Sequence, residues 1–317
     1  METGEQNTNE DVLETIKVSV WRLGGLHWKD LIWRVWEELY AGHLLVHAAA
    51  LAFYFLFAIF PLLIFLVNVL GLFVARGPDL RAGLIDFLRR LAPASAFALI
   101  NTTVEEIAVS ADLAKLMFGL IAALWFGSLG VAALSESLNA MYGVRESRSW
   151  LRVRASAVGL TIVLLFLTVV ALFLIVYART AGASVAGYFG QTGLFTVLWA
   201  IAQLPLAVVF VLLAFAFVYY FAPDLHDQRW YWITPGSLVG VVLWLAVSAT
   251  LSTYLSYADS YSVTYGSLAG VIILMLWFYV TGAAILIGGK INAEIENAAA
   301  RAGFPDAKLH GERDAGS

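Results

Sequence analysis

Residues 181–223 read AGASVAGYFGQTGLFTVLWAIAQLPLAVVFVLLAFAFVYYFAP and contain no aspartate, glutamate, lysine or arginine. Residues 230–258 and 260–289 also lack these charged side chains. About 20 apolar residues suffice for a helix to cross the roughly 30 Å hydrocarbon core of a bilayer. Because that core offers no water to the backbone, such runs must be helical. The sequence therefore predicts an all-α integral membrane protein.

The composition of the whole chain supports this fold class. Hydrophobic residues make up 61% and charged residues 13% of the 317 residues, whereas soluble domains carry about 25% charged residues. The chain has no cysteine, which excludes disulfides, thiolate nucleophiles and Cys-ligated metal centres. The net charge of -4 is small, so the distribution of charge along the chain is more informative than its sum.

The sequence divides into four segments. Residues 1–14 are polar and acidic, which is typical of a disordered N-terminus. Residues 15–43 alternate apolar and charged side chains at helical spacing and include several tryptophans. This pattern predicts an amphipathic interfacial helix, with a helix that binds a soluble partner as the alternative. Residues 44–296 are expected to form the membrane domain, and residues 297–317 a polar tail.

Six transmembrane helices are expected in the membrane domain. Short amphipathic surface helices are expected between the first two, in residues 75–112. The expected spans are residues 44–74, 114–134, 153–177, 194–221, 233–257 and 265–289.

The orientation follows from the lysines and arginines, which accumulate in cytoplasmic loops. With the N-terminus inside, thirteen of the nineteen basic residues fall in the cytoplasm. Both termini then lie inside, because the expected number of spans is even. The six basic residues on the other side are Arg76, Arg81, Arg89, Arg90, Lys115 and Arg179.

Three stretches resemble one known family. Residues 220–298 read YFAPDLHDQRWYWITPGSLVGVVLWLAVSATLSTYLSYADSYSVTYGSLAGVIILMLWFYVTGAAILIGGKINAEIENA. Residues 47–63 read HAAALAFYFLFAIFPLL, and residues 135–154 read SESLNAMYGVRESRSWLRVR. Together they closely resemble the YihY/virulence factor BrkB family of bacterial inner-membrane proteins.

The resemblance implies a six-helix fold and the bacterial inner membrane, but no settled activity. Members of the family have been labelled ribonuclease BN, and some are associated with serum resistance or with lipid and lipopolysaccharide handling. This chain departs from the family at GGKINAE, where Lys290 stands in place of an acidic residue. Any role that the family gives to that acid is therefore in doubt here.

The residues themselves do not predict an enzyme. A ribonuclease needs a metal site or a general acid and base, together with a basic groove for phosphates. His43 and His47 share one helix face but lack the glutamate of a zinc-binding HExxH motif. We therefore expect no enzymatic activity, cofactor, metal or nucleic-acid partner.

The candidate binding site lies at the cytoplasmic mouth of the bundle. Polar and charged residues there are expected to converge, and an anionic lipid headgroup is the expected ligand. The alternative is capping and loop locking for Glu136 and Asn139, a topogenic role for the arginines of the loop, and surface helix pairing for Asn292 and Glu294. The candidate residues are Glu136, Asn139, Arg145, Arg148, Asn292 and Glu294.

Few other features of the spans indicate function. Asn68 and Gln203 are polar residues inside spans, where hydrogen bonding between helices is the alternative to substrate contact. Pro61 and Pro205 each remove one helix hydrogen bond and predict bends, which can open a cavity or serve packing alone. Asp259 is the sole charge between the last two spans and is a candidate for a contact on the outer side.

These features predict a multi-pass inner-membrane protein that transports or handles a lipid or amphipathic solute. The spans hold wide aromatic and aliphatic surfaces and almost no charge, which suits an acyl chain better than an ion. An uncoupled channel or exporter for small solutes is one alternative, and a structural membrane protein without translocation activity is another. The expected partners are anionic membrane lipids, and a homo-oligomer is left open.

Overall fold

The structure is a computed structural model that describes residues 23, 25–41, 43–76, 113–188, 192–225, 233–257 and 267–301. Within these residues it contains helices and no strand, which confirms the predicted all-α class. The helices are α2 (Trp28–Ala41), α3 (His43–Arg76), α6 (Leu113–Tyr142), α7 (Trp150–Tyr188), α8 (Thr192–Phe221), α9 (Pro235–Tyr257) and α11 (Ser267–Arg301).

Several of the described helices could cross a membrane. Five of them, α3, α6, α7, α9 and α11, are long and apolar enough to do so. The described part of α8 adds a shorter apolar helix, Pro205–Phe221. The chain is thus an all-helical integral membrane protein, while the exact number of six spans stays a prediction. The amphipathic helices expected in residues 75–112 lie outside the described residues.

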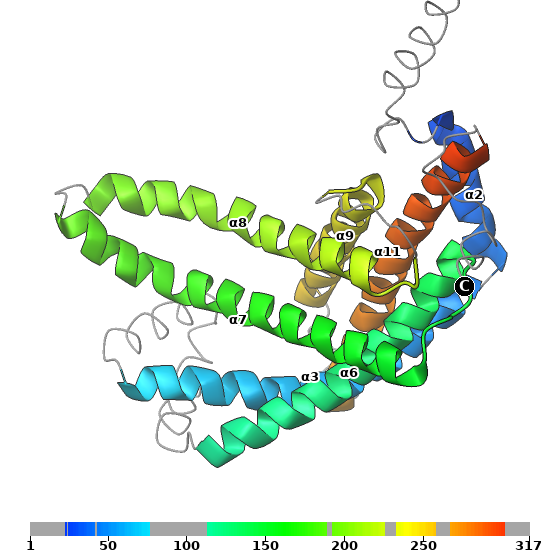
Figure 1. Cartoon of the computed structure of the whole chain (residues 1–317). Helices are drawn as coiled ribbons and strands as arrows, with labels where there is room; N and C mark the ends of the chain where they lie inside the picture. Colours follow the sequence, from blue (N-terminus) through cyan, green and yellow to red (C-terminus); the bar gives the residue numbers. More distant parts are fainter. Residues whose placement is uncertain are drawn as a thin grey trace, which may run out of the picture.

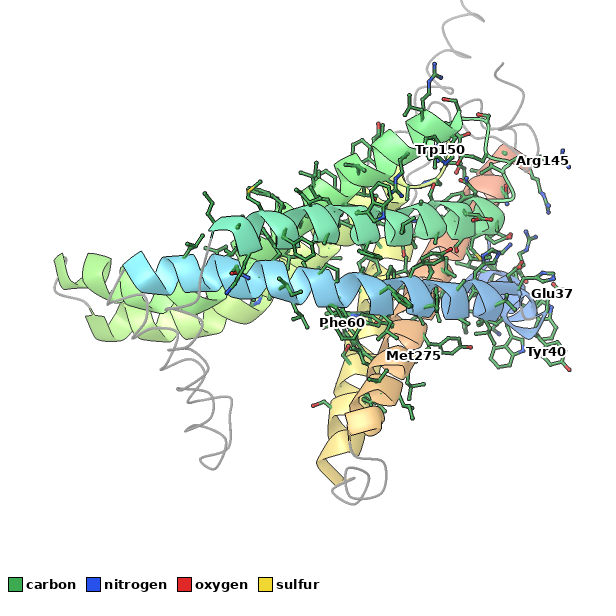
Figure 2. The ribbon with its side chains drawn as sticks, turned by 90° about the horizontal axis from the view of Figure 1, so that it is seen from below. Glu37, Tyr40, Phe60, Arg145, Trp150 and Met275 are labelled. Carbon is green, nitrogen blue, oxygen red and sulfur yellow. The ribbon has the colours of Figure 1, made fainter. Side chains whose placement is uncertain are left out.

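The long helices form three antiparallel pairs, α3 with α6, α7 with α8, and α9 with α11. Helix α11 also contacts α2, α3 and α6, so it joins the pairs together. Figure 1 shows α7 and α8 reaching away to one side, and Figure 2 shows α9 and α11 pointing away from α3 and α6. We call the end at which α6 and α8 finish and α3, α7 and α9 begin the polar end, because charged side chains gather there.

The core lies near the polar end, where the pairs meet. Leu44 and Leu51 of α3, Leu138 of α6 and Leu286 of α11 are fully buried in it. Lipid is as apolar as leucine, so helices in a membrane associate through close packing more than through the hydrophobic effect. At Gly119 of α6, an added Cβ would lie 2.9 Å from the backbone nitrogen of Phe65. The close approach of α3 and α6 therefore requires glycine at this position.

Three helices run well beyond the predicted spans. Helix α7 was expected to end at residue 177 but continues to Tyr188, and α6 and α11 extend at the polar end. The second span was expected to stop at residue 134, but α6 continues to Tyr142. Its polar side chains bond inside the protein: Ser137 donates to the Ala133 carbonyl and Asn139 to Glu146. Polarity here therefore marks internal contacts, and the helix ends only before Gly143, whose φ of 64° is left-handed.

The last helix also extends beyond its predicted end at residue 289, as far as Arg301. Residues 290–301 are rich in strong helix formers. Ile291 and Ile295 are buried against Leu31 and Val35 of α2. This extension gives α2 its docking surface.

Helix α2 lies inside the region predicted as amphipathic. Its buried side, with Leu31 and Val35, packs against α11. Its opposite side is apolar but exposed, which keeps a location in the membrane interface as our expectation for this helix. The exposed side chains are Trp28, Ile32, Trp33, Trp36 and Tyr40.

Candidate functional site at the polar end

The loop between α6 and α7 is held by a network that we call the loop cluster, comprising Ser135, Asn139, Glu146, Ser147, Arg148, Ala222 and Asp224. Its centre is an ion pair in which Arg148 Nε donates to Glu146 Oε1 at 2.7 Å and Nη2 donates to Glu146 Oε2 at 2.8 Å. The Arg148 Nη2 also donates to Ser135 Oγ at 3.0 Å and to the Ala222 carbonyl at 3.1 Å. Arg148 is therefore bonded to α6, to its own loop and to the end of α8.

Asn139 and Asp224 complete the loop cluster. Asn139 Nδ2 donates to Glu146 Oε2 at 2.9 Å, and its Oδ1 accepts the Asp224 backbone N–H at 2.7 Å. Asp224 Oδ2 accepts the backbone N–H and the hydroxyl of Ser147 at 2.8 and 2.6 Å. Asp224 Oδ1 lies 3.4 Å from Arg148 Nε. One amide and one carboxylate thus tie the α6–α7 loop to the residues that follow α8.

The charge of Arg148 is fixed by these contacts. The hydrogen bonds that Arg148 donates to Glu146, together with the negative charges of Glu146 and Asp224, raise the pKa of the Arg148 guanidinium above its ordinary value, against the opposing effect of burial. An anionic headgroup would have to displace a carboxylate that is already bound bidentately. This geometry gives Arg148 a part in fastening the loop, a role that the sequence did not suggest for it.

Glu294 belongs to a second group, an ion-pair ladder between α2 and α11. Lys290 Nζ lies 3.0 Å from Glu294 Oε1 and 3.2 Å from Glu38 Oε2. Arg34 Nη1 donates to Glu294 Oε2 at 3.1 Å. Acidic and basic groups thus alternate from Arg34 through Glu294 and Lys290 to Glu38, so α2 is fixed to α11 by charge as well as by apolar packing.

Asn292 belongs to a third group, at the start of α9. Its Oδ1 accepts the Gly236 backbone N–H at 2.9 Å, and its Nδ2 donates to Thr234 Oγ1 at 3.0 Å. Thr234 and Ser237 cap α9 reciprocally, each accepting the other's backbone N–H through its side-chain oxygen. Asn292 therefore attaches the first turn of α9 to α11.

The six candidate residues share the polar end but do not form one site. Arg148 bonds within the loop cluster, Glu294 within the ion-pair ladder and Asn292 at the start of α9. Between these groups, Tyr142 and Val144 pack against Ala293.

Two of the candidate residues are exposed. Glu136 and Arg145 both lie on the surface, and Figure 2 shows Arg145 at the same end of the molecule as Glu37 and Tyr40. Glu136 makes no hydrogen bond or ion pair with the described residues, which leaves its expected role in a binding site unsupported by any contact.

Polar side chains within the spans bond mainly to their own helices. Asn68 donates to the Ile64 carbonyl of its own helix at 2.8 Å, so the structure shows no hydrogen bond from this amide to another described helix. Five hydroxyls on the other helices behave in the same way. They belong to Ser128, Thr161, Thr168, Thr250 and Thr253, each bonded to a carbonyl three or four residues earlier.

The remaining candidate positions fall in or near the long helices. Pro61 lies inside α3 and Pro205 inside α8, and neither ends its helix. The side chain of Gln203 and the whole of Asp259 lie outside the described residues.

Sequence reasoning missed several members of these groups. Asp224 lies in a polar turn after α8, and Arg34 and Glu38 lie on the polar side of an amphipathic helix, so the local sequence gives no sign of their contacts. Their partners are distant in sequence, with 260 residues between Arg34 and Glu294. Only the local pair Lys290–Glu294, at i and i+4, could be recognised from spacing.

The described residues offer no metal-binding cluster. Within the described part of the chain, no three His, Cys, Asp or Glu side chains are placed to hold a metal ion. In the loop cluster and the ion-pair ladder, acidic side chains are paired with basic ones, and their carboxylate oxygens accept hydrogen bonds. This arrangement suits the fastening of helices rather than proton transfer.

Comparison with known proteins places this fold among bacterial membrane proteins. The family described as virulence factor BrkB matches residues 35–310. A ribonuclease-like protein of Bacillus subtilis, YfkH, is 37% identical over 246 residues, covering 78% of this chain and 88% of that protein. No solved structure matches the chain.

Longer relatives carry the description UPF0761 membrane protein. One from Azoarcus is 30% identical over 253 residues, and one from Xanthomonas campestris is 28% identical over 273 residues. These matches cover 78% and 82% of this chain and 59% of each relative. The chain thus spans less than two thirds of the length of these relatives.

Proposed function

The chain belongs to the virulence factor BrkB family of membrane proteins, and on that premise we propose that it binds lipids from within the bilayer and moves them between its leaflets. The membrane is the bacterial inner membrane in this proposal, and the substrate is an anionic phospholipid or a similar amphipathic molecule.

The distribution of polarity argues against a path for ions. In the described helices, no Asp, Glu, Lys or Arg lies between His47 and Arg76 of α3, in α9, or in α11 before Lys290. In α9, Thr250 and Thr253 donate to carbonyls of their own helix. Ion-coupled transporters place acidic groups near the middle of the membrane. An uncoupled channel for small solutes is also disfavoured, because a wet pore needs polar groups that face it.

The observation that carries the proposal is the divergence of α3 from α11. The two helices pack tightly near the polar end, where a Cβ on Gly282 would lie 3.3 Å from the Ala48 carbonyl oxygen. Phe55 and Phe278 still touch, with ring centroids 5.9 Å apart. Beyond this contact the facing helices separate, and Phe60 is 54% exposed and Met275 38% exposed. Figure 2 shows both residues where the two helices part.

Two diverging apolar walls suit an acyl chain. A lipid tail can lie along aromatic and aliphatic side chains without leaving the bilayer, and it needs no polar partner there. The flexible thioether of Met275 can adapt to tails of different shape.

A reconstitution assay tests the proposal. Purified protein in liposomes should accelerate the transfer of headgroup-labelled phosphatidylglycerol to the outer leaflet, where a membrane-impermeant reductant quenches the label. Transfer at the rate of protein-free liposomes would contradict the proposal and favour a structural role. Leakage of a small trapped solute without lipid transfer would favour the channel.

Cross-linking tests the role of the divergence. The chain has no native cysteine, so Phe60→Cys with Met275→Cys introduces a unique pair that a bifunctional maleimide can bridge. Bridging should slow lipid transfer several-fold, because the walls can no longer separate. The matched control is Phe55→Cys with Phe278→Cys, a pair already in contact, and bridging it should leave the rate unchanged. Equal effects of the two bridges would contradict a path between α3 and α11.

A further inference from the structure

Arg154 of α7 lies against the face of a tryptophan on the neighbouring helix. Its guanidinium carbon is 4.8 Å from the centroid of the Trp125 ring of α6. One terminal nitrogen, Nη2, also donates a long hydrogen bond of 3.5 Å to the Trp125 carbonyl. Stacking of this kind fixes the plane of the guanidinium and leaves N–H groups at its edge available to another partner.

Arg154 differs from the paired basic residues of the polar end. Arg34, Lys290 and Arg148 are each paired with a carboxylate at 3.2 Å or less. Arg154 has no carboxylate partner among the described residues, although it has a full positive charge. Its neighbour Arg152 is exposed and likewise has no acidic partner in the described part of the chain.

The surroundings of Arg154 are apolar and face outward. Trp125 is 61% exposed and Trp150, at the start of α7, is 77% exposed. Ile121 lies one turn before Trp125 in α6 and Leu151 beside Trp150 in α7, and both are also exposed. In a membrane protein such a surface meets lipid, and a cation there is costly unless it reaches an anion at the interface.

We propose that Arg154 and Trp125 form a binding site for the phosphate group of an anionic phospholipid. The site lies on the exposed side of the contact between α6 and α7. The guanidinium edge donates to two phosphate oxygens, and the indole supports the cation from the other side. The acyl chains lie on the exposed apolar side chains of the same edge. A free phosphate ion would have to leave water for this apolar surface, whereas a lipid phosphate is already held at the interface.

This site lies away from the divergence of α3 and α11, and it does not depend on lipid transfer. A lipid can occupy it permanently while another moves elsewhere. The proposal replaces Arg148 as the expected headgroup contact, since the loop cluster already occupies the guanidinium of that residue.

Native mass spectrometry of the purified chain tests the site. Wild-type protein titrated with dioleoyl phosphatidylglycerol should retain one tightly bound lipid, with a clear preference over dioleoyl phosphatidylcholine. Arg154→Gln should weaken the preferred binding by about tenfold, the loss of one charge-assisted contact. Arg154→Lys should recover only part of it, because lysine cannot donate from a planar fork.

Arg152→Gln is the matched control, because it removes the same charge two residues away on the same helix. It should change the binding little. Equal losses in Arg152→Gln and Arg154→Gln would show diffuse attraction to negative lipid and would overturn the site. Competition by inorganic phosphate alone, without preference for phosphatidylglycerol, would overturn the lipid assignment.

The role of the indole needs its own variants. Trp125→Phe should weaken the lipid binding less than Trp125→Ala does. If the two residues act together, Trp125→Ala should cause little further loss of lipid binding in the Arg154→Gln variant. Full additivity would contradict a shared site. Gel filtration confirms the fold of each variant, and Trp125→Phe keeps the test valid if Trp125→Ala does not fold. Because binding is measured without transfer, a failure of the site is distinguishable from a failure of the proposed function.

Discussion

At the scale of single residues, α9 and α11 meet at a point where neither helix can carry a side chain. A Cβ on Gly236 would overlap the Gly288 carbonyl oxygen, and a Cβ on Gly288 would overlap the Tyr219 hydroxyl. That hydroxyl donates to the Ile285 carbonyl at 2.7 Å. The two glycines therefore bring α9, α11 and α8 together at the polar end.

Gly236→Ala tests this contact. The added methyl must push α9 away from α11 and disturb the Asn292 hydrogen bond to the Gly236 N–H, so we expect a loss of about 1–3 kcal/mol of stability. Thermal unfolding in detergent measures it. Gly159→Ala is the matched control, because nothing lies within 4 Å of its added Cβ, and it should be neutral or slightly stabilising. Equal stability of the two variants would show that α9 and α11 can accommodate a methyl group at Gly236.

The loop cluster shows what a single sequence can and cannot predict at this scale. The density of arginines in the loop was evident, and so was the proximity of Asn139 to that loop. The partner Asp224 lies 77 residues from Ser147, and spacing along a chain carries no information about such a contact. An arginine whose N–H groups are already bonded inside the protein is therefore easily mistaken for part of a binding site.

At the scale of elements, the ladder between α2 and α11 makes α2 part of the folded unit. Glu294 stands between Arg34 and Lys290, and its side chain is only 10% exposed. Removing one member of a largely buried ion pair leaves its partner's charge uncompensated. The stability of the α2 attachment should therefore depend on this one carboxylate.

Glu294→Gln should destabilise the protein by about 2 kcal/mol and make α2 more sensitive to limited proteolysis. Glu37→Gln is the control, because this exposed α2 residue makes no hydrogen bond or ion pair with the described residues, and it should have little effect. Arg34→Gln should lower the stability of the Glu294→Gln variant by less than it lowers the stability of the wild-type protein. Strict additivity would mean that Arg34 and Glu294 do not act as a pair.

Helix positions were more predictable than helix contacts. Hydropathy located each long helix, because the bilayer imposes both apolarity and helical structure on a span. It placed the ends of α6 and α11 too early, since Asn139 and Lys290 find their partners inside the protein rather than in water. The periodicity of α2 was also recognised, but only the structure shows Leu31 and Val35 bound to α11 and the tryptophans left outside.

At the scale of the whole molecule, we expect no ribonuclease activity, even though a relative carries a ribonuclease-like name. Among the described residues of the polar end, Arg34, Arg148 and Lys290 are bound to carboxylates and Arg154 lies against Trp125. Arginines and lysines held in this way are unlike a groove for RNA phosphates. Purified protein incubated with a transfer-RNA precursor and Mg²⁺, Mn²⁺ or Zn²⁺ tests this. Cleavage that disappears in His43→Ala or His47→Ala would contradict the expectation.

The last prediction concerns the direction of the whole molecule in the membrane. Thirteen of the nineteen basic residues belong to the side on which the chain begins if six spans cross the bilayer, and we expect that side to be the cytoplasm. Ser149→Cys is exposed in the α6–α7 loop and should react with a membrane-impermeant maleimide only after cells are permeabilised. Ser262→Cys, between the last two expected spans, should react in intact cells. If Ser149→Cys reacted in intact cells and Ser262→Cys did not, the protein would have the opposite orientation. The polar end and its arginines would then face outward, and the positive charge would serve some purpose other than retention at the cytoplasmic face.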